Sequence, residues 1–285
     1  MKTIYACIAE RGNPAAVCDW AAWAALRLAA PLEFLHVLDR HPERAPAHDL
    51  SGSIGLGAQE SLLQELSSLD AERSRLAQEH GRQLLEAART RAAQAGVHQA
   101  STLQRHGELV DTVVELQDDA RLYVLGEHHH APTLAKLHLD HHVERVVRSV
   151  KRPVLVVAGD RPATPQRFVL ACDGSATARA MVDAVAASPL LRGLPCLLAT
   201  AGEPSAAQRS AIDSARDTLA HAGFAVETVV QAGEPEAVLQ ALVRDRAVDL
   251  LVMGAYGHSR IRHLIVGSTT TTMLRTSEVP VLILR

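Results

Sequence analysis

The second half of the chain alternates between short aliphatic runs and longer stretches in which apolar residues recur every three or four positions. The first pattern predicts buried strands and the second predicts amphipathic helices. The expected strands are Phe168–Cys172, Cys196–Thr200, Ala225–Val230, Asp249–Met253 and Val281–Leu284, and the expected helices are Ala176–Ala187, Ala206–Ala222, Pro235–Arg244 and Ser268–Thr276. Strands that alternate with helices predict a parallel sheet with right-handed crossovers.

The same pattern occurs in the first half of the chain. Leu122–Gly126 matches Leu250–Gly254, and the two final glycines lie 128 residues apart. Pro153 and Pro280 each precede a last aliphatic run, and they lie 127 residues apart. Self-similarity at a fixed spacing indicates that the chain is an internal duplication.

The duplication predicts an α/β protein made of two tandem five-stranded parallel-sheet, Rossmann-like sandwiches. The expected domains are residues 1–158 and 166–285, and the first holds a long insertion around 39–78. Within it, residues 41–57 are rich in Pro, Gly, His and Ser and predict a loop. Residues 61–95 predict a long helix, which is either a surface excursion or a lid over the first domain.

Composition excludes several classes of protein. The formal net charge is −3 and aromatic residues make up 3% of the chain, so neither a basic surface nor a stacking platform for nucleic acid is expected. We find no signal peptide and no membrane-spanning run, which predicts a cytoplasmic protein with no membrane partner. The four cysteines, Cys7, Cys18, Cys172 and Cys196, form no CxxC pair and predict reduced core residues.

Candidate chemistry lies in one stretch near the end of the chain. Gly254 closes a predicted strand, Gly257 follows it, and Gly267 comes immediately before the predicted last helix. Glycines let a backbone approach a ligand closely, and a helix N-terminus with free N–H groups attracts phosphate. Taken alone, these residues are compatible with a phosphate-binding site and also with a turn followed by an N-capped helix that binds nothing.

The spacing adds further information. Gly, two residues, Gly, nine residues and Gly-Ser resembles the nucleotide-binding signature of the universal stress protein family. Further similarities are Asp173 after the first strand of the second copy, Gly233-Glu234-Pro235 before a helix, and Val279-Pro280-Val281 at the last strand. The resemblance covers 167–285 closely and 1–158 in outline. It implies an adenine nucleotide α-hydrolase-like fold and an adenine nucleotide, ATP or AMP/ADP, bound with Mg²⁺ or Mn²⁺.

The resemblance also implies roles for particular residues of the second copy. Asp173 would lie near the adenosine, or instead cap the next helix; Ala201 and Met253 would line the adenine pocket, with core packing as the alternative for Met253. Gly254 and Gly257 would border ribose and phosphate. The remaining members of the expected site are Gly174, Ser175, His258 and the phosphate-binding residues Gly267, Ser268, Thr269 and Thr270. No residue is assigned a catalytic or metal-ligating role.

The first copy departs from this pattern. Alignment of Ile4–Ile8 with Val169–Asp173 places Ile8 where the aspartate stands, and His129 or His130 replaces the second glycine. A carboxylate, Asp140, stands near the phosphate position. We therefore expect the first copy to have lost nucleotide binding. The same segment holds six histidines, which form either a solvated patch or a transition-metal site: His128, His129, His130, His138, His141 and His142.

The expected function is that of a stress-response regulator that binds ATP in its second domain. The sequence offers no Walker-type Lys-Ser/Thr pair and no evident general base, so weak ATPase activity is the most we expect. One alternative is a slow ATP-hydrolysing enzyme; another is a scaffold that binds a metal or another ligand through the first domain. The resemblance implies an intrachain pseudo-dimer through the last strands, and leaves a homodimer open.

Overall fold

The computed structural model describes residues 1–9, 13–38, 56–127, 141–159, 163–255 and 268–285. The first copy contains β1 (Thr3–Cys7), α1 (Pro14–Leu28), β2 (Leu32–Leu38), α2 (Leu56–Gln94), β3 (Ser101–His106), α3 (Leu109–Leu116), β4 (Ala120–Gly126), α4 (His141–Ser149) and β5 (Val154–Val157). The second contains β6 (Phe168–Ala171), α5 (Ala176–Ala187), a 3₁₀ turn at Pro189–Leu191, β7 (Cys196–Ala201), α6 (Ala206–His221), β8 (Val226–Gln231), α7 (Pro235–Asp245), β9 (Leu250–Gly254), α8 (Ser268–Thr276) and β10 (Val281–Leu284).

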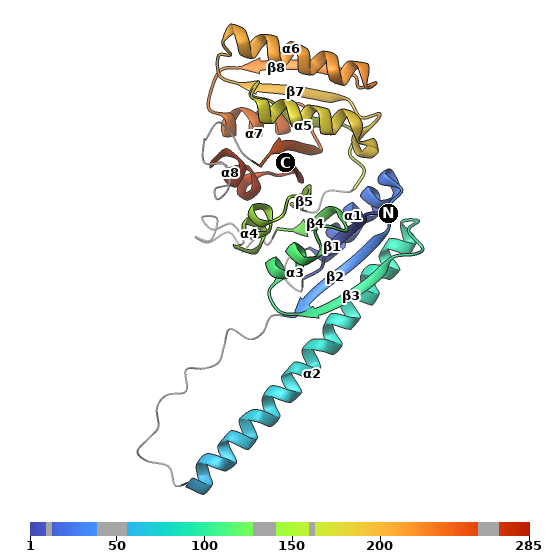
Figure 1. Cartoon of the computed structure of the whole chain (residues 1–285), viewed down its shortest axis with the longest axis vertical. Helices are drawn as coiled ribbons and strands as arrows, with labels where there is room; N and C mark the ends of the chain where they lie inside the picture. The colour runs from blue at the N-terminus through green and yellow to red at the C-terminus, as the bar shows by residue number, and fades with distance from the viewer. Residues whose placement is uncertain (10–12, 39–55, 128–140, 160–162, 256–267) are drawn as a thin grey trace.

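The ten strands of the described residues form one sheet in the order β3-β2-β1-β4-β5-β10-β9-β6-β7-β8. Every neighbouring pair is parallel except β5 and β10, which run antiparallel with Val281 opposite Val156 and Ile283 opposite Val154. The two five-stranded halves therefore have the same internal order, as the duplication predicted, and they meet at their last strands, as the resemblance implied. Figure 1 shows the two halves joined at this point.

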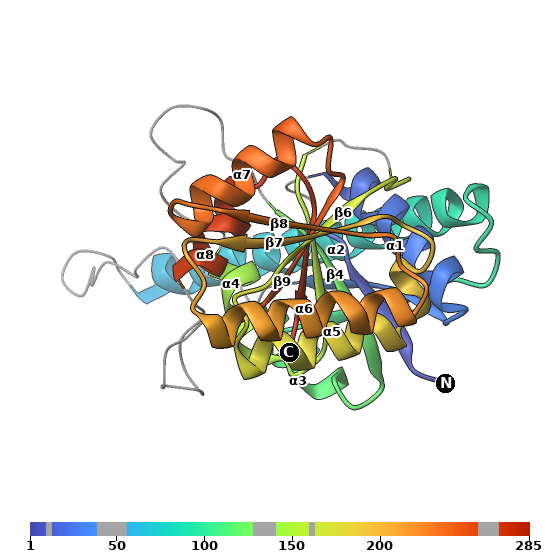
Figure 2. The ribbon, with the colours of Figure 1, turned by 90° about the horizontal axis from the view of Figure 1, so that it is seen from above.

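The core forms one apolar layer on each face of the sheet. One layer joins alternate strand residues to α1, α5, α6 and the second half of α2. The other joins the remaining strand residues to α3, α4, α7 and α8. Figure 2 shows helices on both sides of the strands. Burial of both faces explains why the strands are continuously aliphatic rather than alternating.

The two halves also touch outside the strand pair. The Arg27 guanidinium of α1 donates to the carbonyl oxygen of Leu190 at 3.0 Å and to that of Arg192. On the other face, the Arg285 guanidinium donates to the carbonyl oxygen of Val147 at 2.5 Å and to that of Arg148 at 2.7 Å. These bonds attach each half to the other on both sides of the β5–β10 pair.

The insertion contains the predicted long helix. Helix α2 has 39 residues. Its second half packs on α1, β2 and β3 through Leu85, Ala88 and Ala92, while its first half extends away from the sheet (Figure 1). The interpretation as a surface excursion fits this arrangement. The loop predicted at 41–57 lies almost wholly outside the described residues.

Candidate functional site

The second half has a topological switch point between β6 and β9. The chain proceeds from β6 to β7 and β8 on one side, whereas β9 and β10 lie on the other side. Strand β9 pairs with β6 in parallel, with Leu170 opposite Val252. Loops that leave the carboxyl ends of two such strands diverge, and the crevice between them is where open α/β sheets bind ligands.

The segment after β6 is a tight turn that leads into α5. The Asp173 Oδ1 atom accepts a hydrogen bond from the Ser175 N–H at 3.0 Å, and the Ser175 Oγ atom accepts from the Ala178 N–H at 3.1 Å. Ser175 is therefore the N-cap of α5, and the alternative that Asp173 caps this helix is wrong. Asp173 fixes the turn that precedes the cap.

Gly174 occupies a position that requires glycine. Its φ is +71°, and a Cβ atom there would lie 3.2 Å from the Gln208 Cα atom of α6. The Gln208 Nε2 atom donates to the Asp173 carbonyl oxygen at 3.2 Å. Helix α6 therefore stabilises the Asp173 turn by this hydrogen bond and by packing against Gly174. The sequence gave no reason to expect this contact.

Ala201 and Met253 lie on the same face of the sheet. Strand β6 separates their strands, and both contact the apolar layer under α7 and α8. Ala201 is half-buried, whereas Met253 is only 4% exposed. The packing interpretation of Met253 therefore describes the structure well, and Ala201 is the more accessible of the two side chains.

Helix α8 begins at Ser268, where the sequence predicted it. Ser268 is exposed, Thr269 is half-buried and Thr270 is 2% exposed. The Thr270 hydroxyl donates to the carbonyl oxygen of Gly254 at 3.0 Å, so it attaches the first turn of α8 to the end of β9. The first N–H groups of a helix lack intrahelical acceptors and form the positive end of its dipole. Gly257, His258 and Gly267 lie outside the described residues.

Of the expected site, the structure thus brings the ends of β6, β7 and β9 and the start of α8 to one edge. The sequence did not predict the Gly254–Thr270 bond. A threonine in the first turn of a helix shows that a hydroxyl donor is present, but it does not show which group accepts the hydrogen bond. The sequence also did not predict the bond of Thr200, which is buried and donates from Oγ1 to the Cys172 carbonyl oxygen at 2.7 Å. That bond connects β7 to the residue that follows the last residue of β6.

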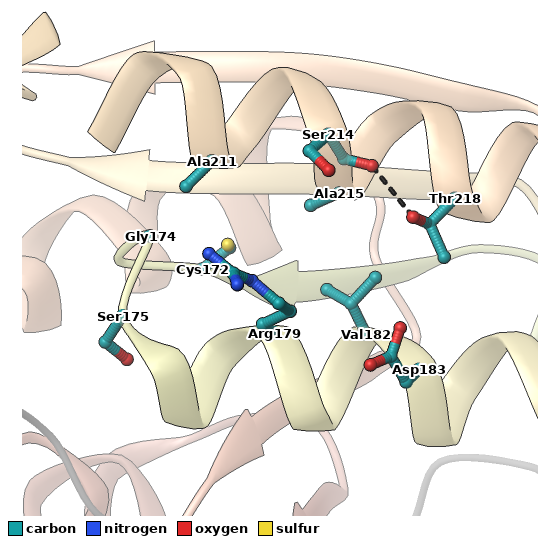
Figure 3. Close-up of a pocket in the computed structure, with 10 residues that line it drawn as sticks. All are labelled: Cys172, Gly174, Ser175, Arg179, Val182, Asp183, Ala211, Ser214, Ala215 and Thr218. Atoms are coloured by element: carbon teal, nitrogen blue, oxygen red, sulfur yellow. Dashed lines mark hydrogen bonds between the residues drawn. The ribbon is translucent and has the colours of Figure 1, made fainter. Parts of the chain in front are cut away.

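A small cavity lies beside the Asp173 turn, between α5 and α6. Figure 3 shows Gly174 and Ser175 at one end, and Arg179 and Thr218 farther along the groove. Its volume is about 20 Å³, which holds about one water molecule. The cavity is therefore a gap between packed helices and does not accommodate a nucleotide.

The first copy corrects one detail of the alignment. In the first strand pair of each half, Ile4 lies opposite Leu32 and Phe168 lies opposite Cys196. The backbone carbonyl oxygen of Ile8 accepts a hydrogen bond from the His36 ring, and that of Cys172 accepts one from the Thr200 hydroxyl. Ile8 is therefore equivalent to Cys172, and the position of Asp173 is taken by Ala9. The prediction that Ile8 stands there is wrong by one residue, because matching the Ala-Cys pair that both strands contain shifts the alignment by one position relative to the strand pairing.

The end of β4 also differs from the end of β9. The Glu127 N–H bonds the Val157 carbonyl oxygen, just as the Ala255 N–H bonds that of Leu284. A buried carboxylate in the first copy thus replaces a buried methyl group in the second. His128, His129, His130, His138 and Asp140 lie outside the described residues, as does the side chain of His141. Within the described part of the chain, no three His, Cys, Asp or Glu side chains form a metal-binding group.

The four cysteines are buried and unpaired with one another. Burial raises the pKa of Cys7, Cys18 and Cys196 to about 12, and it also raises the pKa of Cys172. Such thiols are weak nucleophiles, because the thiolate is the reactive form. The prediction that they are core residues is confirmed.

The chain is thus a duplicated, doubly wound α/β protein with a turn, a glycine and a helix N-terminus at the switch point of its second half, the place where open α/β sheets bind ligands. The chain belongs to the universal stress protein family, whose family model matches residues 1–158 and 165–285. It is 34% identical over 294 residues to the universal stress protein Slr1230 of Synechocystis sp., with all of both chains covered.

Solved structures agree with this fold. A universal stress protein from Archaeoglobus fulgidus is similar with a TM-score of 0.72 and 16% identity, over 99% of this chain and 98% of that one. A putative universal stress protein from Pseudomonas aeruginosa is similar with a TM-score of 0.65 and 18% identity, over 100% and 93%. In the described residues, no helix combines the length and apolarity needed to span a membrane.

Proposed function

We propose that the second half of this universal stress protein binds one adenine nucleotide, ATP together with Mg²⁺ or Mn²⁺. The observation that carries the proposal is the convergence of the Asp173 turn, Gly254 and the first turn of α8 at one switch point. The spacing of Gly254, Gly257 and Gly267-Ser268, which resembles the family's nucleotide signature, supports the same ligand.

Each part of this edge has a role in the proposal. The N–H groups at Ser268, Thr269 and Thr270 bind phosphate oxygens, and the exposed Ser268 hydroxyl adds a further donor. The Thr270 hydroxyl holds the helix in place rather than binding phosphate itself. Ala201 forms an apolar wall for the adenine ring, and Asp173 accepts from the ribose or adenine side.

We also propose that the first half binds no nucleotide. Ala9 offers no carboxylate at the position of Asp173, and the buried Glu127 side chain stands directly after Gly126, where the second half has Ala255. A carboxylate near a phosphate site repels the ligand. Together with Asp140 and the histidines at positions 128, 129, 130 and 138, these substitutions favour a single nucleotide for each chain.

Nucleotide occupancy would then act as a regulatory signal in a stress response. ATP bound at the ends of β9 and α8 changes the surface that a protein partner meets. Weak hydrolysis is compatible with this role, and the proposal does not require it. Measurement of phosphate release with Mg²⁺ distinguishes a regulator from an ATP-hydrolysing enzyme.

The direct test is calorimetric titration of the protein with ATP and Mg²⁺. We expect a stoichiometry near one for each chain. A stoichiometry near two contradicts the assignment of the first half, and no binding of ATP, ADP or AMP contradicts the proposal as a whole.

The variant Ser268→Asp tests where the phosphates lie. A carboxylate at a helix N-terminus favours the helix dipole, so the fold is expected to be slightly more stable, by about 0.3–1 kcal/mol. ATP affinity should nevertheless fall at least tenfold, because the added charge faces the phosphates. The matched control is Ser67→Asp on the exposed stretch of α2 in the first half, which makes the same change far from the site and should leave affinity unaltered.

A further inference from the structure

Helix α2 consists of two parts with different surroundings. Its second part packs on the sheet through Leu85, Ala88 and Ala92. In its first part every side chain from 64 to 73 is exposed. Figure 1 shows this part extending well beyond the rest of the molecule. At a rise of about 1.5 Å per residue, the stretch from residue 64 to residue 80 is about 25 Å long.

A regular stripe of side chains runs along the first part. Leu66, Leu69, Arg73 and Leu76 are separated by three, four and three residues, which is the spacing of the inner positions of a coiled coil. The leucines are among the few large apolar side chains that are at least half exposed, at 50%, 55% and 56%. At about 100° per residue, the stripe lies about 110° around the helix from the face that packs on the sheet.

None of the three leucines belongs to either apolar layer of the described structure. A solvated helix without tertiary packing gains little from hydrogen bonding alone, and most helices depend on covering an apolar face. A stripe with coiled-coil spacing on an extended helix therefore indicates a surface that is covered by another helix.

We propose that this stripe binds the same stripe of a second copy of the chain, as an antiparallel helix pair centred near Ala71. In this register Leu66 faces Leu76 of the second copy, and Leu69 faces Arg73. The stem of an arginine lies along apolar surface while its guanidinium reaches water, so Arg73 is accommodated at the edge of the pair.

The arginine in the stripe favours the antiparallel direction. A parallel pair in register would place Arg73 against Arg73 of the second copy, and like charges at an inner position are unfavourable. The antiparallel register places Arg73 opposite Leu69 instead, beside Asp70 of the second copy. In this register Asp70 lies opposite Glu72, so the preference for the direction comes from Arg73 and not from the acids.

The position of the sheet supports the same direction. The bulk of each chain lies at the C-terminal end of α2. A parallel pair would bring two large bodies together at one end, while an antiparallel pair separates them by the length of the helix. The intrachain strand pair β5–β10 plays no part in this contact.

The first test is the mass of the full chain in solution by light scattering. We expect twice the 30.6 kDa of one chain, and a return to the single mass in the double variant Leu66→Glu/Leu69→Glu. The control Ser67→Glu/Ala71→Glu adds the same charge to the opposite side of the same exposed segment and should keep the double mass. A single mass for the unaltered chain, or a double mass that survives the leucine changes, overturns the proposal.

Disulfide formation tests the direction. The native cysteines are buried, so introduced thiols on α2 react selectively. A mixture of Leu66→Cys and Leu76→Cys chains should form a covalent heterodimer on oxidation, while Leu66→Cys alone should remain mostly uncrosslinked. Efficient crosslinking of Leu66→Cys alone means a parallel pair and overturns the antiparallel assignment.

Discussion

Replacing Thr270 by valine removes one hydroxyl and changes almost nothing else. Valine has the shape of threonine and is also β-branched, so the packing of this 2% exposed side chain is kept. The bond from Thr270 Oγ1 to the Gly254 carbonyl oxygen, 3.0 Å long, is lost. A buried bond contributes about 0.5–1.5 kcal/mol, and an acceptor left unsatisfied costs about 1–3 kcal/mol. We expect unfolding to become easier by about 1–3 kcal/mol.

The functional part of this prediction is that ATP binding weakens as well. Without the bond, the first turn of α8 is no longer held against the end of β9, and its N–H groups are no longer aligned for phosphate. Denaturant unfolding measures the first effect and calorimetric titration the second. Thr271→Val, on the same helix and half-buried, is the matched control and should alter neither. If Thr270→Val lowers stability but leaves ATP affinity unchanged, α8 does not position the phosphates.

Other predictions concern the rest of the chain. Gly81→Ala should lower stability by about 1 kcal/mol despite the higher helix propensity of alanine. The new Cβ atom would lie 2.5 Å from the His36 Cδ2 atom and 2.4 Å from the Gln104 Nε2 atom. An unchanged or raised unfolding midpoint would show that α2 does not pack against His36 and Gln104 at this position. Above about pH 9, stability should fall, since unfolded thiols ionise near their ordinary pKa of about 8.5 while burial raises the pKa of folded Cys7 and Cys196 to about 12. The stability that these buried thiols contribute is fully present below a pH of about 8.5, and above it the free energy of unfolding falls by up to about 1.4 kcal/mol per pH unit for each thiol. Denaturant titrations at pH 7 to 10 that show no decline would refute this prediction. ATP at 100 times its Kd should stabilise the protein by about 2.7 kcal/mol in thermal unfolding, and a nucleotide that produces no shift is not a ligand of the folded state.

The elements of the second half were predictable because each has a strong local signal. Helix α5 begins after a serine N-cap, α6 begins with a complete capping box at Ser205 and Gln208, and α7 has a proline in its first turn. The pairing of the last strands followed from the resemblance to the universal stress protein family, because no local pattern contains it.

The tertiary contacts of the site were less predictable. The Thr270 hydroxyl finds its acceptor sixteen residues away, at the end of another element. Gln208 supports the Asp173 turn only because α6 packs beside α5. The one-residue misplacement of Ile8 arose because both first strands contain an Ala-Cys pair, and these two pairs are one position out of step in the strand pairing.

The antiparallel join of β5 to β10 has a consequence for how the two halves can diverge. When two identical chains pair, each substitution appears in both, so a change that harms one site harms the other as well. Here the two halves are encoded separately within one chain, yet they share a single hydrogen-bonded sheet. Ala9 and Glu127 alter the first half while Asp173 and Ala255 remain in the second. Covalent linkage thus gives this protein an asymmetric pair whose members are free to specialise.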